Sequence, residues 1–254
     1  MRYFTFGGVD SRTHFLTNYI KRPFLPPITV PTMEIPRKAG VIPLQRNEIG
    51  VREITIGVTM MAVSHVDIRQ RVRALSAFLV KETEQDLIIS DEIDKKYLAR
   101  FNGSGNDLEE LAYTGEGELT FTCFDPFAYA LTELTQLSTN QETIITNAGT
   151  VEAYPRFRLV TSVNVPFILI KNATTGKSLT YNATWFASTP LIIDAKTNRV
   201  YQENTGENFI KYLTLASDFF PLAIGANTLR METEATGAIN QISSFRTYWT
   251  ERYY

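Results

Sequence analysis

The sequence predicts a mainly β protein, with an α+β N-terminal part and an all-β C-terminal part. Three observations support this prediction: strand-like alternation at residues 52–60, helical spacing directly after it, and hairpin patterns in the second half. The 254 residues suffice for one large β-rich domain or two of ordinary size. Because 44% of them are hydrophobic, the chain can bury a sizeable core.

Residues 52–60 (REITIGVTM) alternate between two kinds of side chain. Ile54, Ile56, Val58 and Met60 share one face, whereas the opposite face carries threonine and glycine. A period of two is typical of a strand with one buried face. This segment is therefore expected to be a half-buried strand.

The spacing changes directly after this strand. Apolar side chains recur every three or four residues at Ile68, Val72, Leu75 and Leu79. This pattern predicts one amphipathic helix over about residues 65–80, packed on a sheet.

Shorter elements surround the helix. Strands are predicted at residues 87–90 and 97–101, followed by a glycine-containing loop at 103–111. Before the helix, residues 21–43 contain six prolines outside any alternating pattern. Because proline lacks the N–H that a central strand donates, this segment is expected to be an extended arm.

The second half contains two hairpin patterns, at residues 167–181 and 191–201, each with a polar turn between apolar runs. Evenly spaced short strands without helical stretches indicate a two-sheet sandwich or jelly roll. Between the halves, aromatic residues vanish and Thr, Asn and Gln accumulate. This shift predicts a connector at 134–148, between an N-terminal domain at 1–133 and a C-terminal domain at 149–254.

The single cysteine, Cys123, raises the question of catalysis because an acid follows two residues later. A nucleophilic thiol needs a base, usually histidine, and surroundings that lower its pKa. The two histidines, His14 and His65, are distant in sequence. Since Cys123 alternates with Phe121 on one strand face, it is expected to be a core residue in a strand that Pro126 ends.

Other chemical sites receive little support. The acidic run at residues 91–94 (DEID) lacks the oxygen spacing of a calcium loop, so it is interpreted as a solvated turn. Two histidines and one cysteine cannot supply the usual four zinc ligands. Composition leaves a Ser-His-Asp triad open, but no nucleophile elbow, phosphate loop or dinucleotide fingerprint occurs. We expect no enzyme, no cofactor, and no catalytic, cofactor-binding or metal-binding residues.

Four aromatic residues of the second half allow two interpretations. Trp185, Phe186, Tyr248 and Trp249 could form a platform on which sugars stack. They could equally fill the interior of a sandwich, and this interpretation is favoured because such cores routinely take large aromatic side chains.

Charge and hydropathy exclude further classes of protein. The formal net charge is −2 and the basic residues are scattered, which argues against sequence-specific nucleic-acid binding. The N-terminus lacks an export-signal pattern, and the most apolar stretch (VNVPFILI) is too short to span a bilayer. We expect a soluble protein that is made in the cytoplasm and does not insert into membranes.

Several motifs in order resemble the distal tail protein family of long-tailed, non-contractile bacteriophages. The segment FTCFDPFAYA (121–130) is similar to the F-x-C-x-D-P-Y-A-Y end of the family's first domain. MEIPRKAG (33–40) resembles the family's V-P-G-R-D-G segment, although no glycine precedes Arg37. NAGTVEAYPRFRL (147–159) and SDFFPLAIGANTLR (217–230) resemble the start and a later strand pair of its outer domain.

The resemblance implies a fold and a role. It implies an N-terminal split β-barrel-like domain with one helix and a C-terminal galectin-like β-sandwich. N-terminal domains would form a hexameric ring, single or stacked, as a hub at the tail tip of the virion. This hub would join the major tail tube protein to the tail fibre or tail-associated lysin protein, and in some members the outer domains carry receptor-binding proteins. The alternative function is a carbohydrate-binding module acting in host recognition.

Overall fold

The computed structural model describes residues 2–45, 47–60, 65–103, 116–138, 140–233 and 241–254. The chain divides into two compact units, the N-terminal unit (Met1–Tyr129 with Tyr254) and the C-terminal unit (Ala130–Tyr253). The prediction of a mainly β fold is confirmed, since 50% of the residues lie in strands.

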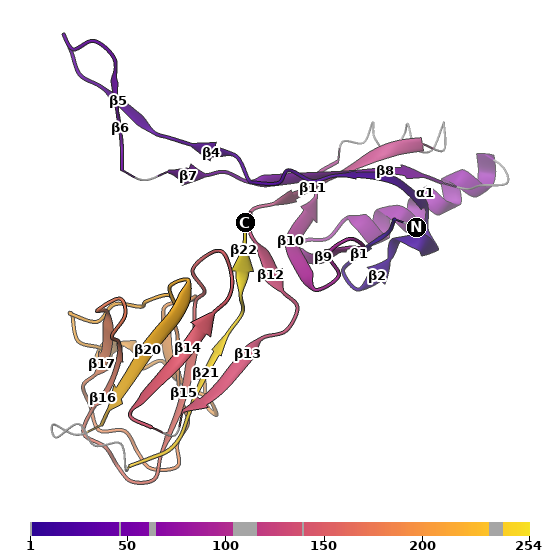
Figure 1. Cartoon of the computed structure of the whole chain (residues 1–254). Helices are drawn as coiled ribbons and strands as arrows, with labels where there is room; N and C mark the ends of the chain where they lie inside the picture. Colours follow the sequence, from indigo (N-terminus) through magenta and orange to yellow (C-terminus); the bar gives the residue numbers. More distant parts are fainter. Residues whose placement is uncertain (1, 46, 61–64, 104–115, 139, 234–240) are drawn as a thin grey trace. The chain divides into compact units, whose positions relative to one another are not determined.

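The N-terminal unit combines a twisted antiparallel sheet with the helix α1 (His65–Leu79). Its other elements are β1 (Phe4–Phe6), β2 (Val9–Asp10), η1 (Ser11–Thr13), β3 (Leu16–Lys21), β8 (Arg52–Thr59), β9 (Gln85–Ile89), β10 (Lys95–Phe101), β11 (Glu116–Cys123) and β12 (Ala128–Ala130). The strand order is β2-β1-β9-β10-β11-β8-β3, with β12 pairing to β10. Because this path has two ends, the described strands form an open sheet (Figure 1).

Strand β8 confirms the predicted alternation. Ile54, Ile56 and Val58 are fully buried, and β11 pairs with β8 along its whole length, from Glu116 opposite Thr59 to Cys123 opposite Arg52. The predicted strands at 87–90 and 97–101 correspond to β9 and β10, which pair with each other. The expected loop at 103–111 lies outside the described residues from position 104 onward.

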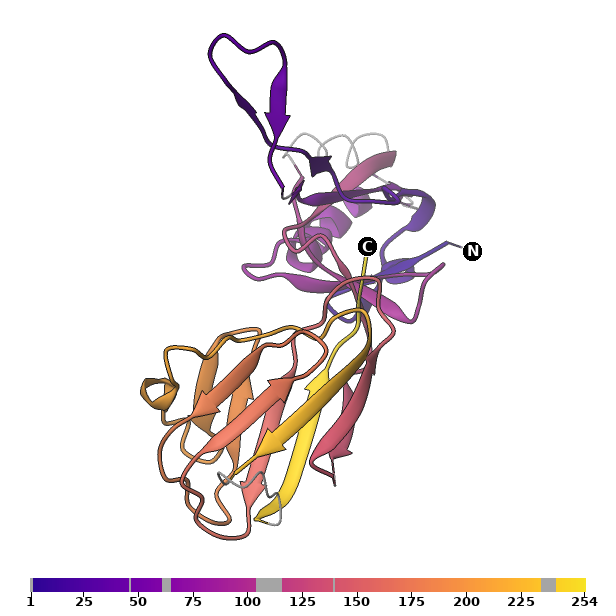
Figure 2. The ribbon, with the colours of Figure 1, turned by 60° about the vertical axis from the view of Figure 1, so that its left-hand side comes forward.

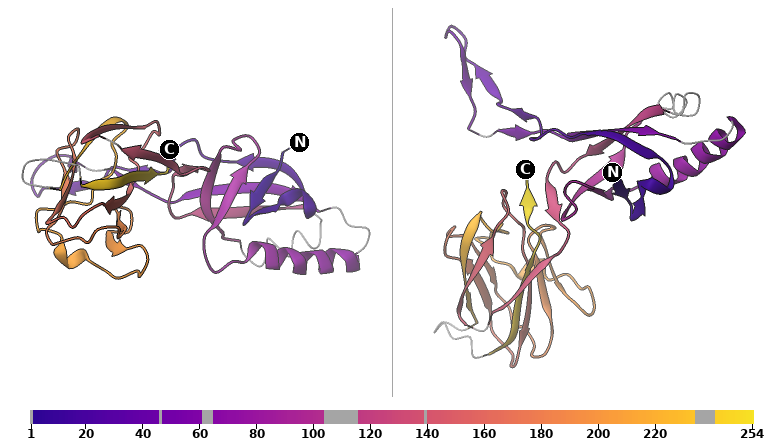
Figure 3. Two further views of the ribbon diagram at one scale, coloured as in Figure 1. Left: turned by 90° about the horizontal axis from the view of Figure 1, so that it is seen from below. Right: turned by 45° about the vertical axis from the view of Figure 1, so that its right-hand side comes forward.

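Helix α1 confirms the predicted helix and lies along the sheet of its unit (Figure 3). Leu75 and Leu79 are fully buried, as its spacing predicts. The ring of Phe78 meets that of Phe6 edge-on at 5.8 Å, which joins helix to sheet. The side chains of Ile68 and Val72, also expected on the apolar side, lie outside the described part of the chain.

The segment between β3 and β8, residues 22–51, leaves the sheet as a long hairpin that we call the arm (Figures 1 and 2). It consists of two short ladders. In one, β4 (Ile28–Thr29) pairs with β7 (Glu48–Ile49); in the other, β5 (Thr32–Glu34) pairs with β6 (Val41–Pro43). The extended arm predicted from the prolines is therefore confirmed.

The C-terminal unit is the expected two-sheet sandwich (Figure 2). Its elements are β13 (Leu134–Ser138), β14 (Glu142–Asn147), β15 (Arg156–Thr161), β16 (Ile168–Asn172), β17 (Ser178–Tyr181), β18 (Leu191–Asp194), β19 (Arg199–Gln202), η2 (Ile210–Tyr212), β20 (Gly225–Glu232), β21 (Ile242–Trp249) and β22 (Arg252–Tyr253). One sheet has the order β13-β21-β15-β18-β19 and the other β14-β20-β16-β17. Apolar side chains from both sheets share one buried core.

Both predicted hairpins of this unit are present. Strand β16 pairs with β17, and β18 pairs with β19. Their turns use backbone conformations with positive φ, at Gly176 (76°) and Asn198 (53°), which suit these two residue types.

The prediction of a connector at 134–148 is wrong, because the structure has strands there. Within this range, residues 134–138 form β13 and residues 142–147 form β14, which are outer strands of the two sheets. An outer strand needs apolar side chains on one face alone, so polar and threonine-rich composition is compatible with strand structure. Within the described residues, no helix is long and apolar enough to cross a membrane.

Candidate functional site

The arm exposes apolar side chains along its whole length. Phe24 is 91% exposed and Met33 51% exposed. The other exposed large apolar residues of the arm are Leu25, Ile28, Val30, Ile35, Val41, Leu44, Ile49 and Val51. Many exposed large apolar side chains on one segment are typical of a surface that contacts another molecule.

The backbone of the arm leads to the same conclusion. Each ladder has two strands of two or three residues, and an isolated two-stranded hairpin is marginally stable at best in water. Both edges of the ladders remain open for pairing with another chain. Prolines such as Pro31 and Pro36 restrict the unbound arm, which lowers the entropy lost when it docks.

The tip of the arm is a tight turn with a specific conformation. Lys38 N–H donates to Ile35 O at 3.1 Å, so Pro36 and Arg37 are the two central residues. Arg37 has φ of 67°, the value that a type II turn requires at its second central residue. Proline before it presets the first central position. The turn therefore forms here without the glycine that usually accommodates positive φ.

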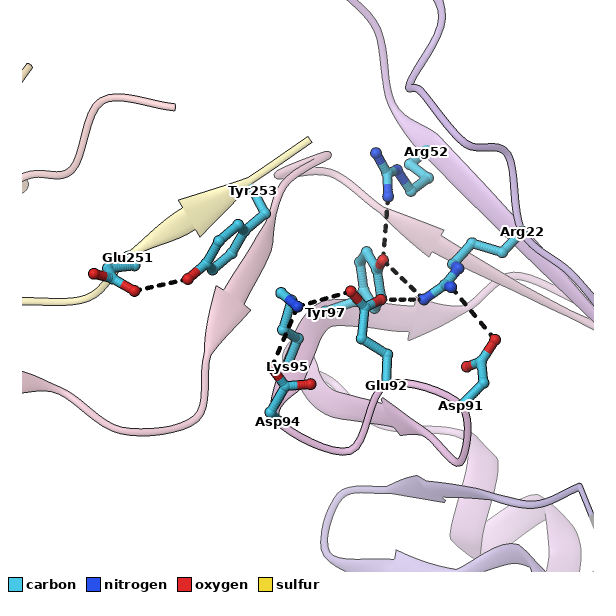
Figure 4. Close-up of polar contacts among 9 residues, drawn as sticks. All are labelled: Arg22, Arg52, Asp91, Glu92, Asp94, Lys95, Tyr97, Glu251 and Tyr253. Atoms are coloured by element: carbon cyan, nitrogen blue, oxygen red, sulfur yellow. Dashed lines mark hydrogen bonds and ion pairs between the residues drawn. The ribbon is translucent and has the colours of Figure 1, made fainter. Parts of the chain in front are cut away.

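The two ends of the arm meet at one buried hydroxyl group (Figure 4). Tyr97 Oη accepts from Arg22 Nη1 at 3.2 Å, where the chain enters the arm, and from Arg52 Nη1 at 3.3 Å, where it returns. Arg22 also donates to Glu92 at 2.5 Å. Burial raises the pKa of Tyr97, which is 3% exposed. These contacts fix the base of the arm to β10 and the turn before it.

The acidic run at 91–94 forms a turn, as expected, but it is more than a solvated one. Lys95 Nζ bridges Glu92 at 2.9 Å and Asp94 at 3.3 Å, and Arg22 pairs with Glu92 and Asp91. Asp91 and Glu92 therefore serve as counter-ions for Arg22 at the base of the arm. Within the described residues, no group of three or more His, Cys, Asp or Glu side chains is placed to hold a metal ion.

Cys123 is a core residue, as predicted. Its side chain is fully buried, and this burial raises the pKa of the thiol to about 12. A nucleophilic cysteine needs the opposite shift. The strand ends at Cys123, three residues before Pro126, so the missing N–H of that proline is not what ends it. His14, one candidate base, contacts the rings of Phe15 and Phe78 instead.

A second candidate surface is an aromatic pocket of about 490 Å³ in the C-terminal unit. We call it the aromatic pocket; its lining residues are Tyr181, Ala183, Thr184, Trp185, Phe186, Thr189, Gln202, Glu207, Phe209 and Tyr212. Trp185 meets Phe209 edge-on at 5.2 Å and Tyr181 edge-on at 5.7 Å. Pockets of this size that combine aromatic walls with a few polar groups are typical small-ligand sites.

The aromatic interpretation made from the sequence is confirmed for both tryptophans. Trp185 and Trp249 are 3% and 6% exposed, and both belong to the sandwich core. Phe186 differs, because 64% of it is exposed at the pocket. Trp185 has two roles, since it packs in the core and also forms part of the pocket wall.

Two protein families match this chain, one in each unit. Residues 11–123 match the family described as the phage tail protein RIFT-related domain, and residues 148–253 match the C-terminal domain of siphovirus-type tail components. A curated relative, the distal tail protein of Bacillus phage SPP1, is 25% identical over 174 residues, which are 67% of each chain. The chain belongs to the phage distal tail protein family.

Solved structures agree with this assignment at the level of the fold. The crystal structure of the SPP1 distal tail protein, described as a paradigm of the hub adsorption apparatus in phages that infect Gram-positive bacteria, matches with a TM-score of 0.81. It is 20% identical, and the match covers 100% of both chains. A chain of the phage P2 baseplate in its activated conformation matches with a TM-score of 0.51 at 9% identity, over 99% of this chain and 98% of that one.

Of the two candidate surfaces, the arm and the aromatic pocket, the sequence predicted the arm alone. The density of prolines indicated the arm before its strands were known. The aromatic pocket was not predicted because its walls come from two separate stretches, residues 181–189 and 202–212, and neither stretch forms it alone. Phe186 was singled out, but nothing in the sequence distinguished it from its buried neighbour Trp185.

Proposed function

We propose that this distal tail protein forms a hexameric ring, single or stacked, that is the hub of the phage tail tip. In this proposal the ring joins the tail tube to the tail fibre or adsorption apparatus and supports tail assembly. The protein is a structural component and not an enzyme. Its partners are the major tail tube protein, a tail fibre or tail-associated lysin protein, and receptor-binding proteins carried by a galectin-like C-terminal sandwich.

The observation that supports the ring is the exposed apolar arm. A ring needs two different patches on each subunit, because the front of one subunit must fit the back of the next. The arm supplies a projecting apolar patch with open strand edges. We propose that the arm docks on the neighbouring subunit, where its apolar side chains and open strand edges become covered.

The base of the arm suits this role. Arg22 and Arg52 hold both of its ends at Tyr97, so the direction in which the arm leaves the sheet is set before contact. A preset direction lowers the entropy cost of docking and favours one angle between neighbours. A repeated front-to-back contact closes a ring when its rotation brings the last subunit back to the first, and otherwise builds a helical filament.

The test is the solution mass of the purified full chain, measured by light scattering across a concentration series. We expect a mass near six chains, or twelve for stacked rings, and ring-shaped particles by negative-stain electron microscopy. A chain that stays monomeric at every concentration, with and without purified tail tube protein, would contradict the proposed ring.

Carbohydrate binding by the C-terminal unit is a second candidate function. The observation that favours it is the aromatic pocket, with the exposed ring of Phe186 at its wall. This activity would add to the hub role, because it uses a different unit of the chain.

A further inference from the structure

We infer that the aromatic pocket binds a neutral saccharide, held between aromatic side chains and the polar groups of Glu207, Gln202 and two threonines. This inference deepens the second candidate function and does not depend on the arm or on ring formation. The absence of a ring would be seen by light scattering, and the absence of a sugar site by glycoside titration, so the two proposals are tested separately.

The pocket is already built by backbone hydrogen bonds. Trp185 and Val165 exchange two of them, at 2.8 and 3.0 Å, and the Trp185 indole donates to Thr189 O at 2.8 Å. Phe209 N–H donates to Val200 O at 2.7 Å, and Asn182 N–H donates to Tyr212 O at 2.9 Å. A site fixed in this way loses little entropy when a ligand enters.

The aromatic walls suit a sugar ring. Five of the ten lining residues are aromatic, and their rings pack on one another mainly edge-to-face, at 88° for Trp185 with Phe209 and 65° for Tyr181 with Tyr212. Phe186 adds a ring that is 64% exposed in the free protein. The C–H face of a sugar can cover such a ring, which removes apolar surface from water.

The polar groups separate a saccharide from other ligands. The Glu207 carboxylate makes no hydrogen bond or ion pair to any residue that the structure describes, so it is free to accept from hydroxyl groups. Gln202 Oε1 accepts from Thr205 at 3.2 Å, which leaves its amide nitrogen as a donor for a ligand. Thr184 adds a hydroxyl group to the lining, and Thr189 Oγ1, which donates to Ala187 O at 3.3 Å, adds an acceptor. Together they match the alternating donors and acceptors of a sugar.

Charged ligands fit the pocket less well. An anion would meet Glu207 and no lining lysine, arginine or histidine. A quaternary ammonium ion could use the aromatic faces and Glu207, but it offers no hydrogen bonds to Gln202 or the threonines. Burial raises the pKa of Tyr181 to about 12, so this wall residue stays uncharged across the physiological range.

The experiment titrates the full chain with the methyl glycosides of glucose, galactose, rhamnose and N-acetylglucosamine, and with tetramethylammonium as a counter-probe. The readouts are calorimetry and the intrinsic tryptophan fluorescence, to which Trp185 in the pocket wall contributes beside Trp249. We expect saturable binding of at least one glycoside with Kd on the order of 1 mM. Phe186→Ala and Glu207→Ala should each weaken it roughly tenfold.

The matched control is Phe124→Ala, which removes a similarly exposed ring, 57% exposed, from the N-terminal unit. It should leave glycoside binding unchanged, and circular dichroism should show that all three variants are folded. Absence of binding by every glycoside would overturn the inference. So would equal binding by the Phe186→Ala and Glu207→Ala variants, or binding of tetramethylammonium alone.

Discussion

The arm and the sandwich use the same kind of residue in opposite ways. In the sandwich, Phe157, Phe220 and Phe245 are fully buried, and the ring of Phe157 contacts the rings of the other two. In the arm, Phe24 is 91% exposed and Met33 is 51% exposed. The sandwich therefore buries these rings within its own core, whereas the arm leaves comparable side chains exposed.

The difference has an energetic meaning. Burying one phenylalanine or methionine side chain contributes about 1.5–3 kcal/mol to stability, and the sandwich gains this repeatedly. The exposed apolar side chains of the arm gain almost none of this burial free energy within one chain. That free energy would be gained if the arm became covered on association. Substitutions of apolar residues should consequently lower the free energy of unfolding in the sandwich and the free energy of association in the arm.

The largest expected effect is on folding of the sandwich. Phe245→Ala removes a fully buried ring that stacks on Phe157 at 5.8 Å. Its free energy of unfolding should fall by about 3–5 kcal/mol, because transfer and cavity costs add. Denaturant unfolding followed by tryptophan fluorescence measures this loss. Phe24→Ala is the matched control, and a comparable destabilisation by it would break the contrast between the two regions.

A smaller effect is expected on association. Phe24→Ser together with Met33→Ser should weaken self-association roughly tenfold or more while leaving thermal unfolding unchanged, because both side chains are exposed in one chain. Sedimentation velocity across a dilution series measures the change. Leu215→Ser is the control, since Leu215 is fully exposed on the C-terminal unit. Equal weakening by this control would remove the special role of the arm.

The smallest effect concerns the buried thiol, which reports on the folded sheet of the N-terminal unit. Burial raises the pKa of Cys123 from 9.0 to about 12, so the folded state favours the protonated thiol. Its stabilising contribution should be complete below pH 9 and should decrease as the pH rises toward 12. Cys123→Ala should reduce the loss of stability between pH 9 and 11, measured by urea unfolding. If the free energy of unfolding changed with pH identically in the unsubstituted chain and in Cys123→Ala, the raised pKa of the Cys123 thiol would be contradicted.

The same residue gives a simple reactivity test. A disulfide reagent that detects free thiols should react with Cys123 slowly in the folded protein and at once in denaturant, because the native thiol is fully buried. Rapid reaction under native conditions would contradict its place in the core.

Elements with strict periodicity could be predicted from the sequence. Strand β8 and helix α1 were predictable because one face of each is apolar and buried, as Ile56 and Leu75 show. Cys123 followed from the same rule. The prolines predicted the arm, but its two ladders could not be predicted, since pairs such as Met33 with Ile42 depend on the course of the whole hairpin.

The outer strands and the pocket were harder for a physical reason. In β13 and β14, solvent covers one face, so residues such as Thr135 and Thr146 replace the apolar run that signals a strand. The aromatic pocket depends on three-dimensional proximity between β17, the segment after it, and residues 202–212. No local pattern marks a site that several separate segments form.

The most direct test of the arm compares two masses. Replacing residues 30–47 by Asn-Gly joins Thr29 to Glu48, which already face each other in the β4–β7 ladder, through a favoured two-residue hairpin turn. Light scattering would measure this shortened chain beside the full one at equal concentration. We predict that the full chain assembles to six or twelve copies and that the shortened chain is a folded monomer with unchanged thermal unfolding. Intact rings of the shortened chain would contradict the account.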